Sequence, residues 1–303
     1  MVKIIAPASA TVINGISMGK GSAFAISLYL TAEVNIIGFN TKDDIEITCI
    51  VDNKNINTDM MKIAVRYAYD ALNKCDKFNL KNIQIEVKTK SDIPMASGLS
   101  SSSASSNAIV KATILALLEK TNLTMEAVNL TDDDILNIAI DASLEAKVTI
   151  TGAYDDAIAS YYGGLYITDN YKRKVIKHKQ LKDNQKILIY IPNKNSHSGQ
   201  ADVKSMKLLA PLVKLAYKEA INDNITDALT LNGILYCTSL DFNTQITMKA
   251  LKAGAYAAGL SGTGSAYIIL SDNEYLGNIK EALSEYPGRI IEVSTDNTGL
   301  KRV

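Results

Sequence analysis

Apolar and polar residues alternate over residues 45–51, and this period of two predicts the first strand, with one face buried. Residues 58–73 instead repeat apolar positions every three or four residues, which is the spacing of an amphipathic helix. Residues 83–87 return to the strand pattern. The pattern therefore predicts a strand, a helix and a second strand as the first regular elements.

A segment rich in serine and glycine, residues 97–106, runs into residues 108–115, whose composition favours helix. Thr131 is a good N-cap for the next helix, because three aspartates follow it in the first turn, where acids suit the helix dipole. We expect that helix to extend to Lys147.

Patterns in the rest of the chain predict strands at residues 165–168, 187–191, 266–270 and 290–293, and helices at residues 202–222, 225–237, 245–258 and 275–286. Pro211 should kink or divide the helix at residues 202–222. No linker, low-complexity tract or repeat separates these elements, so we expect two halves that share one interface. The boundary falls near residues 180–200, which divides the chain into residues 1–185 and 186–303.

The composition is that of a globular protein able to bury a core, because the 303 residues are 47% apolar and 21% charged. Lysine and arginine total 32, as do aspartate and glutamate, so the net charge is zero. No broad basic field exists to attract nucleic acid or a membrane surface, and any anion site must be local.

The chain has three cysteines, far apart and odd in number, which argues against a disulfide framework or a zinc site. Its two histidines provide almost no material for a histidine metal site or a Ser-His-Asp triad. The first residues lack the architecture of a signal peptide, and no apolar run approaches the ~20 residues of a membrane span. We therefore expect a cytoplasmic location.

The strongest local signal is a segment of small residues ahead of a helix. Its residues are Pro94, Met95, Ala96, Ser97, Gly98, Leu99, Ser100, Ser101, Ser102, Ser103 and Ala104. Small side chains let a ligand approach the backbone, the helix N-terminus offers unpaired N–H groups, and serine hydroxyls can bind phosphate or magnesium. A flexible serine loop or a serine-capped helix accounts for the same composition equally well. The segment is neither a Walker loop nor a three-glycine dinucleotide motif.

Three carboxylates are candidates for chemistry. Asp155 and Asp156 are adjacent in an apolar setting, which indicates either a surface turn or a carboxylate that accepts a proton from a substrate hydroxyl. Glu145 follows Ile138 and Ala142 at helical spacing and should point inward. Its place near the helix C-terminus disfavours an acid unless a cation is bound, and an exposed glutamate is the alternative.

A second glycine-rich segment, residues 260–265, connects a helix to a strand and suits either backbone contact with a ligand or a tight turn. Together with the serine segment it resembles the ordered motifs of the GHMP kinases, a family named for galacto-, homoserine, mevalonate and phosphomevalonate kinases. The serine segment is similar to the family's Pro-x-x-x-Gly-Leu-Gly-Ser-Ser-Ala motif, with Ser100 replacing the third small residue, glycine. Residues 6–11 are similar to the first motif and residues 259–267 to the third.

This resemblance implies the α/β (α+β), two-domain GHMP kinase fold, with ATP in the groove between the halves. It also implies that the serine segment cradles the ATP phosphates and that Ser102 and Glu145 hold Mg²⁺. By the same resemblance Asp156 is the catalytic base, with Asp155 as the alternative. Lys20, between Gly19 and Gly21, lacks the upstream glycine of a Walker motif but is a further candidate for stabilising charge near the reacting groups.

Within the family, Ser9 stands where mevalonate-kinase-like members carry lysine, and Asp156 stands where homoserine kinases carry asparagine. Four segments instead resemble the archaeal shikimate kinase subgroup, at residues 6–9, 19–26, 101–104 and 151–157. The resemblance therefore implies transfer of the γ-phosphoryl group of ATP to the 3-hydroxyl of shikimate. A kinase of the family with another small-molecule acceptor and an inactive binding relative are the alternatives. Arg66, Lys147 and Lys204 are candidates for binding the shikimate carboxylate.

Overall fold

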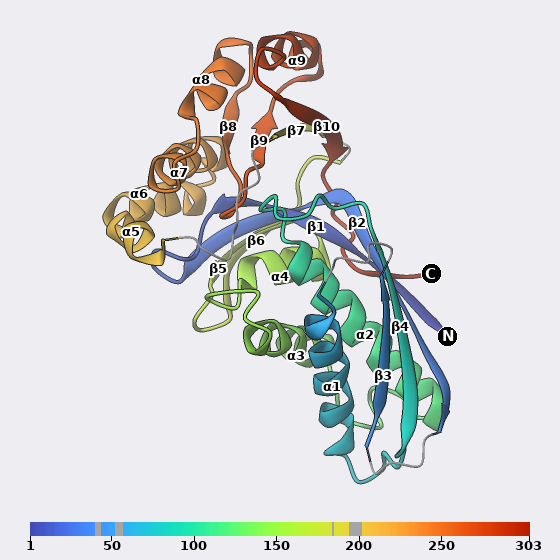
Figure 1. Ribbon diagram of the computed structural model, residues 1–303. Coiled ribbons are helices and arrows are strands. Elements are labelled where there is room, and N and C mark those ends of the chain that lie inside the picture. Colours follow the sequence, from blue (N-terminus) through green and yellow to red (C-terminus); the bar gives the residue numbers. More distant parts are fainter. Residues whose placement is uncertain (40–43, 52–56, 184, 194–201) are drawn as a thin grey trace.

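The structure is a computed structural model that describes residues 1–39, 44–51, 57–183, 185–193 and 202–303. It contains two β-sheets, each covered by helices (Figure 1). The long strands β1 and β2 run between the helices of the N-terminal half and the elements of the C-terminal half. None of the described helices is long and apolar enough to cross a membrane.

The larger sheet has seven strands among the described residues. They are β1 (Val2–Ile13), β2 (Lys20–Phe39), β3 (Glu46–Val51), β4 (Ile83–Ser91), β5 (Leu165–Asp169), β6 (Lys174–Lys179) and β11 (Lys301–Arg302). β2 holds this sheet together, because it pairs with β1 along most of its length, with β5 near its start and with β4 near its end. Every pairing is antiparallel except that of β3 with β4.

The prediction that residues 45–51 form the first strand is wrong, because β1 and β2 precede them. The alternation that marks a half-buried strand is absent from most of β1, in which every residue from Ala6 to Ile13 is buried. Its alanines and Pro7 also weaken the strand signal. β6 is likewise missing from the predicted strands.

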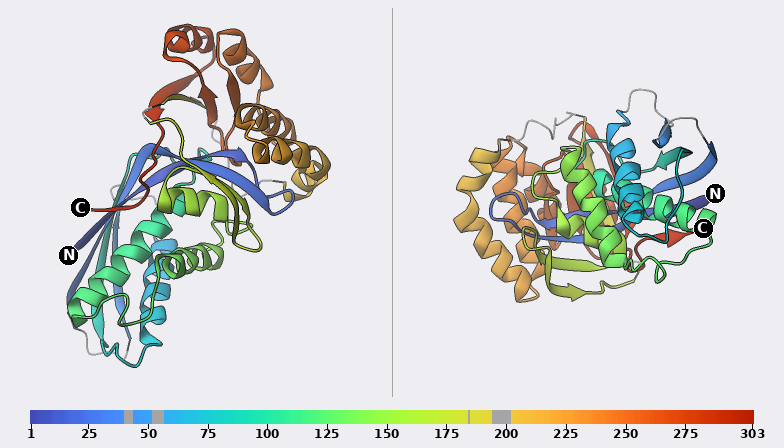
Figure 2. Two further views of the ribbon diagram at one scale, coloured as in Figure 1. Left: turned by 180° about the vertical axis from the view of Figure 1, so that it is seen from behind. Right: turned by 90° about the horizontal axis from the view of Figure 1, so that it is seen from below.

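Four helices lie on one side of the larger sheet, where three of them contact its strands and the other packs on those three (Figure 2). They are α1 (Asp59–Asn73), α2 (Ser101–Thr121), α3 (Asp132–Glu145) and α4 (Tyr154–Tyr162). The predicted N-cap of α3 is confirmed, since the Thr131 side chain accepts a hydrogen bond from the Asp134 amide at 3.2 Å. α3 ends two residues before Lys147. α2 starts at Ser101, inside the predicted serine loop. The serines of its first turns are small enough to be buried where the helix packs against the sheet.

The smaller sheet has the strand order β10-β7-β9-β8. Its strands are β7 (Lys186–Pro192), β8 (Ala257–Leu260), β9 (Tyr267–Leu270) and β10 (Gly288–Ser294). The helices of this half are α5 (Val203–Leu208), α6 (Ala210–Ile221), α7 (Ile225–Ser239), α8 (Thr244–Lys252) and α9 (Leu276–Leu283), with a short 3-10 turn, η2 (Asn273–Tyr275), before the last. The predicted division near Pro211 is confirmed, because α5 and α6 separate just before it.

The helix predicted over residues 245–258 is wrong in its second part. α8 ends at Lys252, and Gly254 then adopts a φ of +109°, which a helix cannot continue through. The alanine-rich segment that follows forms β8 because it pairs with β9. β11 returns to the larger sheet beside β1. The domain boundary between residues 185 and 186 stays a prediction.

Candidate active site

A serine-rich loop leads from β4 into α2, and its backbone alternates in handedness. Ala96, Gly98 and Ser100 have φ values of +52°, +80° and +55°, whereas Ser97 and Leu99 do not have positive φ. Such alternation is typical of backbone nests, in which successive N–H groups bind one anion. The unpaired N–H groups of the first turn of α2 follow directly. The loop and the helix start therefore form a surface suited to phosphate.

This loop is held from the C-terminal half by the glycine segment between β8 and β9. The Ser261 hydroxyl donates to the Gly98 carbonyl at 2.8 Å, and the Ala266 amide donates to the Ser97 carbonyl at 2.9 Å. The backbones touch at Gly264, where an added Cβ would lie 2.0 Å from the Gly98 nitrogen. Glycine is therefore required at 264 by close packing.

The first sequence motif joins the same cluster through β1. The Thr11 amide donates to the Ser261 hydroxyl at 3.0 Å. Three segments that lie far apart in the sequence thus meet at one place, at the contact between the two halves. The hydroxyl of Thr11 is buried and has no hydrogen-bond partner among the described residues.

Asp156 lies beside this loop, in the first turn of α4. Its carboxylate accepts a hydrogen bond from the Ser9 hydroxyl at 2.8 Å, and the hydroxyl of Ser100 lies close enough to lower its pKa. Because Ser100 is the N-cap residue of α2, Asp156 sits at the start of that helix. Burial raises the pKa of Asp156, and the two hydroxyl donors oppose that rise. A half-buried carboxylate with neutral donors is a suitable general base.

Asp155 is more deeply enclosed, with 2% of its surface exposed. Its carboxyl group accepts a hydrogen bond from the Asn170 side-chain amide at 2.8 Å and packs against Gly21, where an added Cβ would lie 2.2 Å from Oδ2. Burial, followed by the neighbouring charge of Asp156, raises its pKa well above the usual range. The two adjacent aspartates therefore occupy different environments.

The expectation that Glu145 points inward is wrong, because its side chain is exposed at the last position of α3. The expected phase relied on Ile138, which is only half-buried. The buried residues of α3 are instead Ile135, Leu136, Ala139, Ile140, Ala142 and Ser143. The buried face is thus rotated away from position 145. A metal-binding role for Glu145 stays a prediction.

Lys20 does not meet the two aspartates. Successive residues of a strand point to opposite faces, and Gly21 faces Asp155. Lys20 extends the other way, with its Nζ 5.7 Å from the centre of the Tyr217 ring on α6. A catalytic role for Lys20 stays a prediction.

Ser101 and Ser102 are half-buried in the first turn of α2, so they border the phosphate surface without being enclosed. The described residues contain no group of three or more histidine, cysteine or acidic side chains that could hold a metal ion. Magnesium in phosphoryl-transfer sites takes one or two carboxylates together with phosphate oxygens, and so needs no such cage. A serine hydroxyl and a carboxylate are oxygen donors of the kind that suits it.

The candidates for binding an acceptor carboxylate differ in their surroundings. Arg66 is already paired with Asp44, with a second contact of 3.0 Å between Nη2 and Oδ2. Lys147 and Lys204 are exposed. Sequence reasoning missed Asn170 altogether, and its only signal was a polar residue just after a buried strand.

Comparison with protein families matches residues 63–164 to the GHMP kinases N terminal domain and residues 221–288 to the GHMP kinases C terminal domain. A curated shikimate kinase from Methanothermobacter thermautotrophicus is 44% identical over 301 residues, which cover 97% of this chain and 96% of the relative. One from Methanobrevibacter smithii is 44% identical, with coverage of 97% and 96%. A solved galactokinase from Lactococcus lactis, complexed with galactose, superposes with a TM-score of 0.72 at 14% identity and covers 100% of this chain and 95% of its own.

Proposed function

The chain belongs to the GHMP kinases and has their two-domain fold, and on that premise we propose that it transfers the γ-phosphoryl group of ATP to the 3-hydroxyl of shikimate. One observation carries the chemistry. The Asp156 carboxylate accepts a hydrogen bond from Ser9 at 2.8 Å and lies beside the hydroxyl of Ser100, the N-cap residue of α2. This arrangement puts a base next to the surface that receives phosphate.

In the proposed reaction the acceptor hydroxyl lies between Asp156 and the bound nucleotide. Asp156 orients the hydroxyl and takes its proton while the hydroxyl oxygen bonds to the γ-phosphorus. The bond from that phosphorus to the bridging oxygen breaks, and ADP leaves. The amides of residues 98–103 stabilise the charge on the phosphate oxygens without covalent chemistry.

Ser102 and Glu145 would hold Mg²⁺, which supplies neutralisation of the charge on the β- and γ-phosphates when bound. The exposed position of Glu145 at the end of α3 leaves its carboxylate accessible to a cation. An acid at that end of a helix is unfavourable alone, so a cation would offset the helix dipole.

Shikimate is favoured as the acceptor by two arguments. The curated archaeal relatives that align along nearly the whole chain are named shikimate kinases. In addition, the Asp156 carboxylate accepts a hydrogen bond from the hydroxyl of Ser9. Mevalonate-kinase-like members carry lysine at this position, so serine here disfavours mevalonate as the acceptor. The base therefore has no cation from the first motif.

The test is a coupled assay of ADP formation with ATP, magnesium and one acceptor at a time: shikimate, mevalonate, homoserine or galactose. We expect turnover with shikimate alone and a phosphate monoester product by phosphorus NMR. An Asp156→Asn preparation, purified in parallel, excludes a contaminating kinase. Turnover with a different acceptor would reassign the substrate, and no turnover with any would reject the proposal.

A further inference from the structure

The side chain of Asn170 clamps the buried carboxyl group of Asp155. The Asn170 side-chain amide donates to Asp155 Oδ1 at 2.8 Å, and its side-chain carbonyl accepts from the Asp155 backbone N–H at 3.3 Å. Asn170 is itself fixed, because the Thr168 hydroxyl donates to its carbonyl at 2.6 Å and its own backbone amide donates to the Gly19 carbonyl at 2.7 Å. The clamp thus ties the first turn of α4 to the end of β5.

Two glycines make room for this clamp. An added Cβ at Gly21 would lie 2.2 Å from Asp155 Oδ2, and one at Gly15 would lie 2.4 Å from the Asn170 side-chain nitrogen. Neither glycine has the left-handed backbone conformation that would demand glycine for other reasons. Their absence of a side chain is therefore explained by the space that the aspartate and asparagine occupy.

No lysine, arginine or histidine of the described chain forms an ion pair with Asp155. The titratable groups that influence or surround it are Asp156 on the same helix, Tyr217 of α6 and Tyr236 of α7. Lys20 of β2 has its Nζ 5.7 Å from the centre of the Tyr217 ring, in neither ion pair nor hydrogen bond with the Asp155 carboxyl group. An ionised carboxylate buried without a cation is costly, so the neutral acid is the favoured form.

We propose that Asp155 is a positioning residue, which acts as a neutral acid clamped by Asn170 and holds the first turn of α4 so that Asp156 meets Ser9 and Ser100. This inference rests on the proposed phosphoryl transfer, in which Asp156 is the base. It separates the roles of two adjacent aspartates: Asp156 exchanges the proton, and Asp155 fixes where Asp156 stands.

The kinetic test compares Asp155→Ala and Asp155→Asn in the full chain. Loss of the clamp lets α4 shift, and a misplacement of ~1 Å costs about 100-fold in rate, so we expect Asp155→Ala to lower kcat by roughly 10- to 100-fold with the KM for ATP unchanged. A neutral asparagine side chain reproduces the shape and charge of the neutral acid, and we expect Asp155→Asn to restore most of that loss. A charged base would instead lose as much activity on conversion to asparagine as on conversion to alanine, and that outcome would overturn the proposal.

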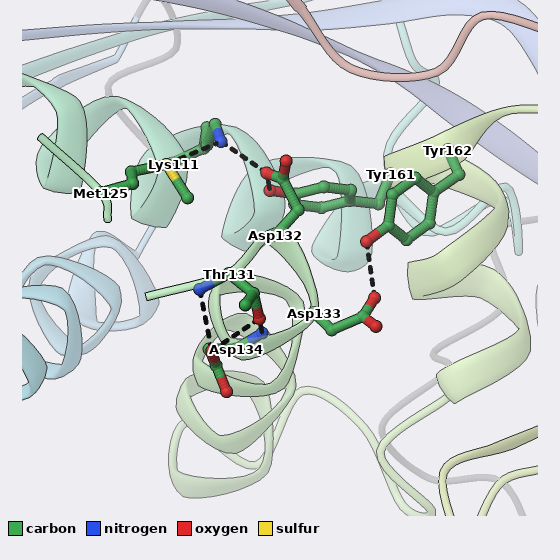
Figure 3. A network of polar contacts seen from close by, with 8 residues as sticks. All are labelled: Lys111, Met125, Thr131, Asp132, Asp133, Asp134, Tyr161 and Tyr162. Atoms are coloured by element: carbon green, nitrogen blue, oxygen red, sulfur yellow. Dashed lines mark hydrogen bonds and ion pairs between the residues drawn. The ribbon is translucent and has the colours of Figure 1, made fainter. Parts of the chain in front are cut away.

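The matched control is Asp132→Ala, which loosens the other end of the same helix because Asp132 accepts a hydrogen bond from Tyr161 of α4 (Figure 3). We expect it to lower stability while kcat of the folded protein stays as in the wild type. Equal kcat losses in Asp132→Ala and Asp155→Ala would mean a general loosening of α4 and reject a specific positioning role. If Asp155→Ala does not fold, Asn170→Ala removes the same clamp and should lower kcat in the same direction.

A second readout needs no activity, so it survives failure of the proposed function. Urea unfolding of the wild type and of Asp155→Asn is measured between about pH 5 and pH 8. An unfolded aspartate titrates near pH 3.9, so above it the unfolded wild type has released a proton that the folded protein keeps. The wild-type folding constant should therefore fall relative to Asp155→Asn by up to about tenfold per pH unit. Parallel pH dependences would show an ionised Asp155 and overturn the neutral-acid assignment.

Discussion

Two helices of the N-terminal half, α3 and α4, both have adjacent aspartates in their first turn, and the surroundings differ in burial and in the cation beside Asp132. At the start of α3 each acid has a donor that compensates it (Figure 3). Asp132 accepts from Lys111 Nζ at 2.5 Å, Asp133 accepts from the Tyr162 hydroxyl at 2.6 Å, and Asp134 completes the capping box with Thr131. At the start of α4, the donors to Asp155 and Asp156 among the described residues are all neutral.

The difference appears in the pKa values of the two groups. Burial raises the pKa of Asp132, but the hydrogen bonds from Lys111 and Tyr161 and the charge of Lys111 together outweigh burial, so its pKa is lowered. Burial raises the pKa of both Asp155 and Asp156, and no cation in the described part of the chain reverses that effect. Acids that a fold leaves uncompensated are candidates for function, whereas compensated acids serve stability.

The largest expected effect separates the acids by activity. Asp156→Asn removes the base and should lower kcat by about 10²- to 10⁴-fold in the coupled assay, with little loss of stability. Asp133→Asn, at the equivalent second position of the other run, should leave kcat unchanged. The comparison fails if both variants lose activity alike.

The next prediction concerns the contribution of the α3 aspartates to stability. Lys111→Met removes the cation beside Asp132, whose side chain is 50% exposed, so we expect a loss of about 1–2 kcal/mol in urea unfolding at neutral pH and no change in kcat. Because the folded pKa of Asp132 is lowered, the contribution of this pair is present above the unfolded pKa and is lost as pH falls through the folded pKa. The difference in unfolding free energy between Lys111→Met and the wild type should therefore become smaller as the pH falls. A gap that widens in acid would contradict this account.

A smaller effect tests the capping box of α3. Thr131→Ala removes the acceptor for the Asp134 amide and should cost about 1 kcal/mol of unfolding free energy. Thermal unfolding measures it, and kcat should be as in the wild type. Thr124→Ala, which removes a hydroxyl that accepts from the Ala127 amide at 3.3 Å outside any helix, is the control and should cost less.

The smallest effect concerns the pH profile of activity. Ser9→Ala removes a hydrogen bond to ionised Asp156 and should raise its pKa further, because that bond lowers it. The acid limb of kcat/KM should move to higher pH, with roughly a threefold loss on that limb and a smaller one at the optimum. Ser160→Ala, whose hydroxyl donates to the Pro7 carbonyl at 2.7 Å, should leave the profile in place. If the acid limb of the kcat/KM profile stays in place in Ser9→Ala, Asp156 is not the catalytic base.

Local patterns sufficed for much of the fold. The period of apolar residues predicted α1 within one residue at its start, and Thr131 followed by acids predicted the cap of α3. These features depend on neighbours within one or two helical turns. The motifs that identified the family also lie in short segments, at residues 6–11, 94–104 and 259–267.

The sequence by itself thus determined the local helices and the segments from which the site is built. Only the tertiary structure decided that β1 and β2 are strands, that Glu145 is exposed, and which of the two aspartate runs lacks a cation. The contacts responsible join residues far apart in the chain: Ser9 meets Asp156, and Ser261 meets Gly98. Burial and pairing depend on such contacts, and no local pattern of residues encodes them.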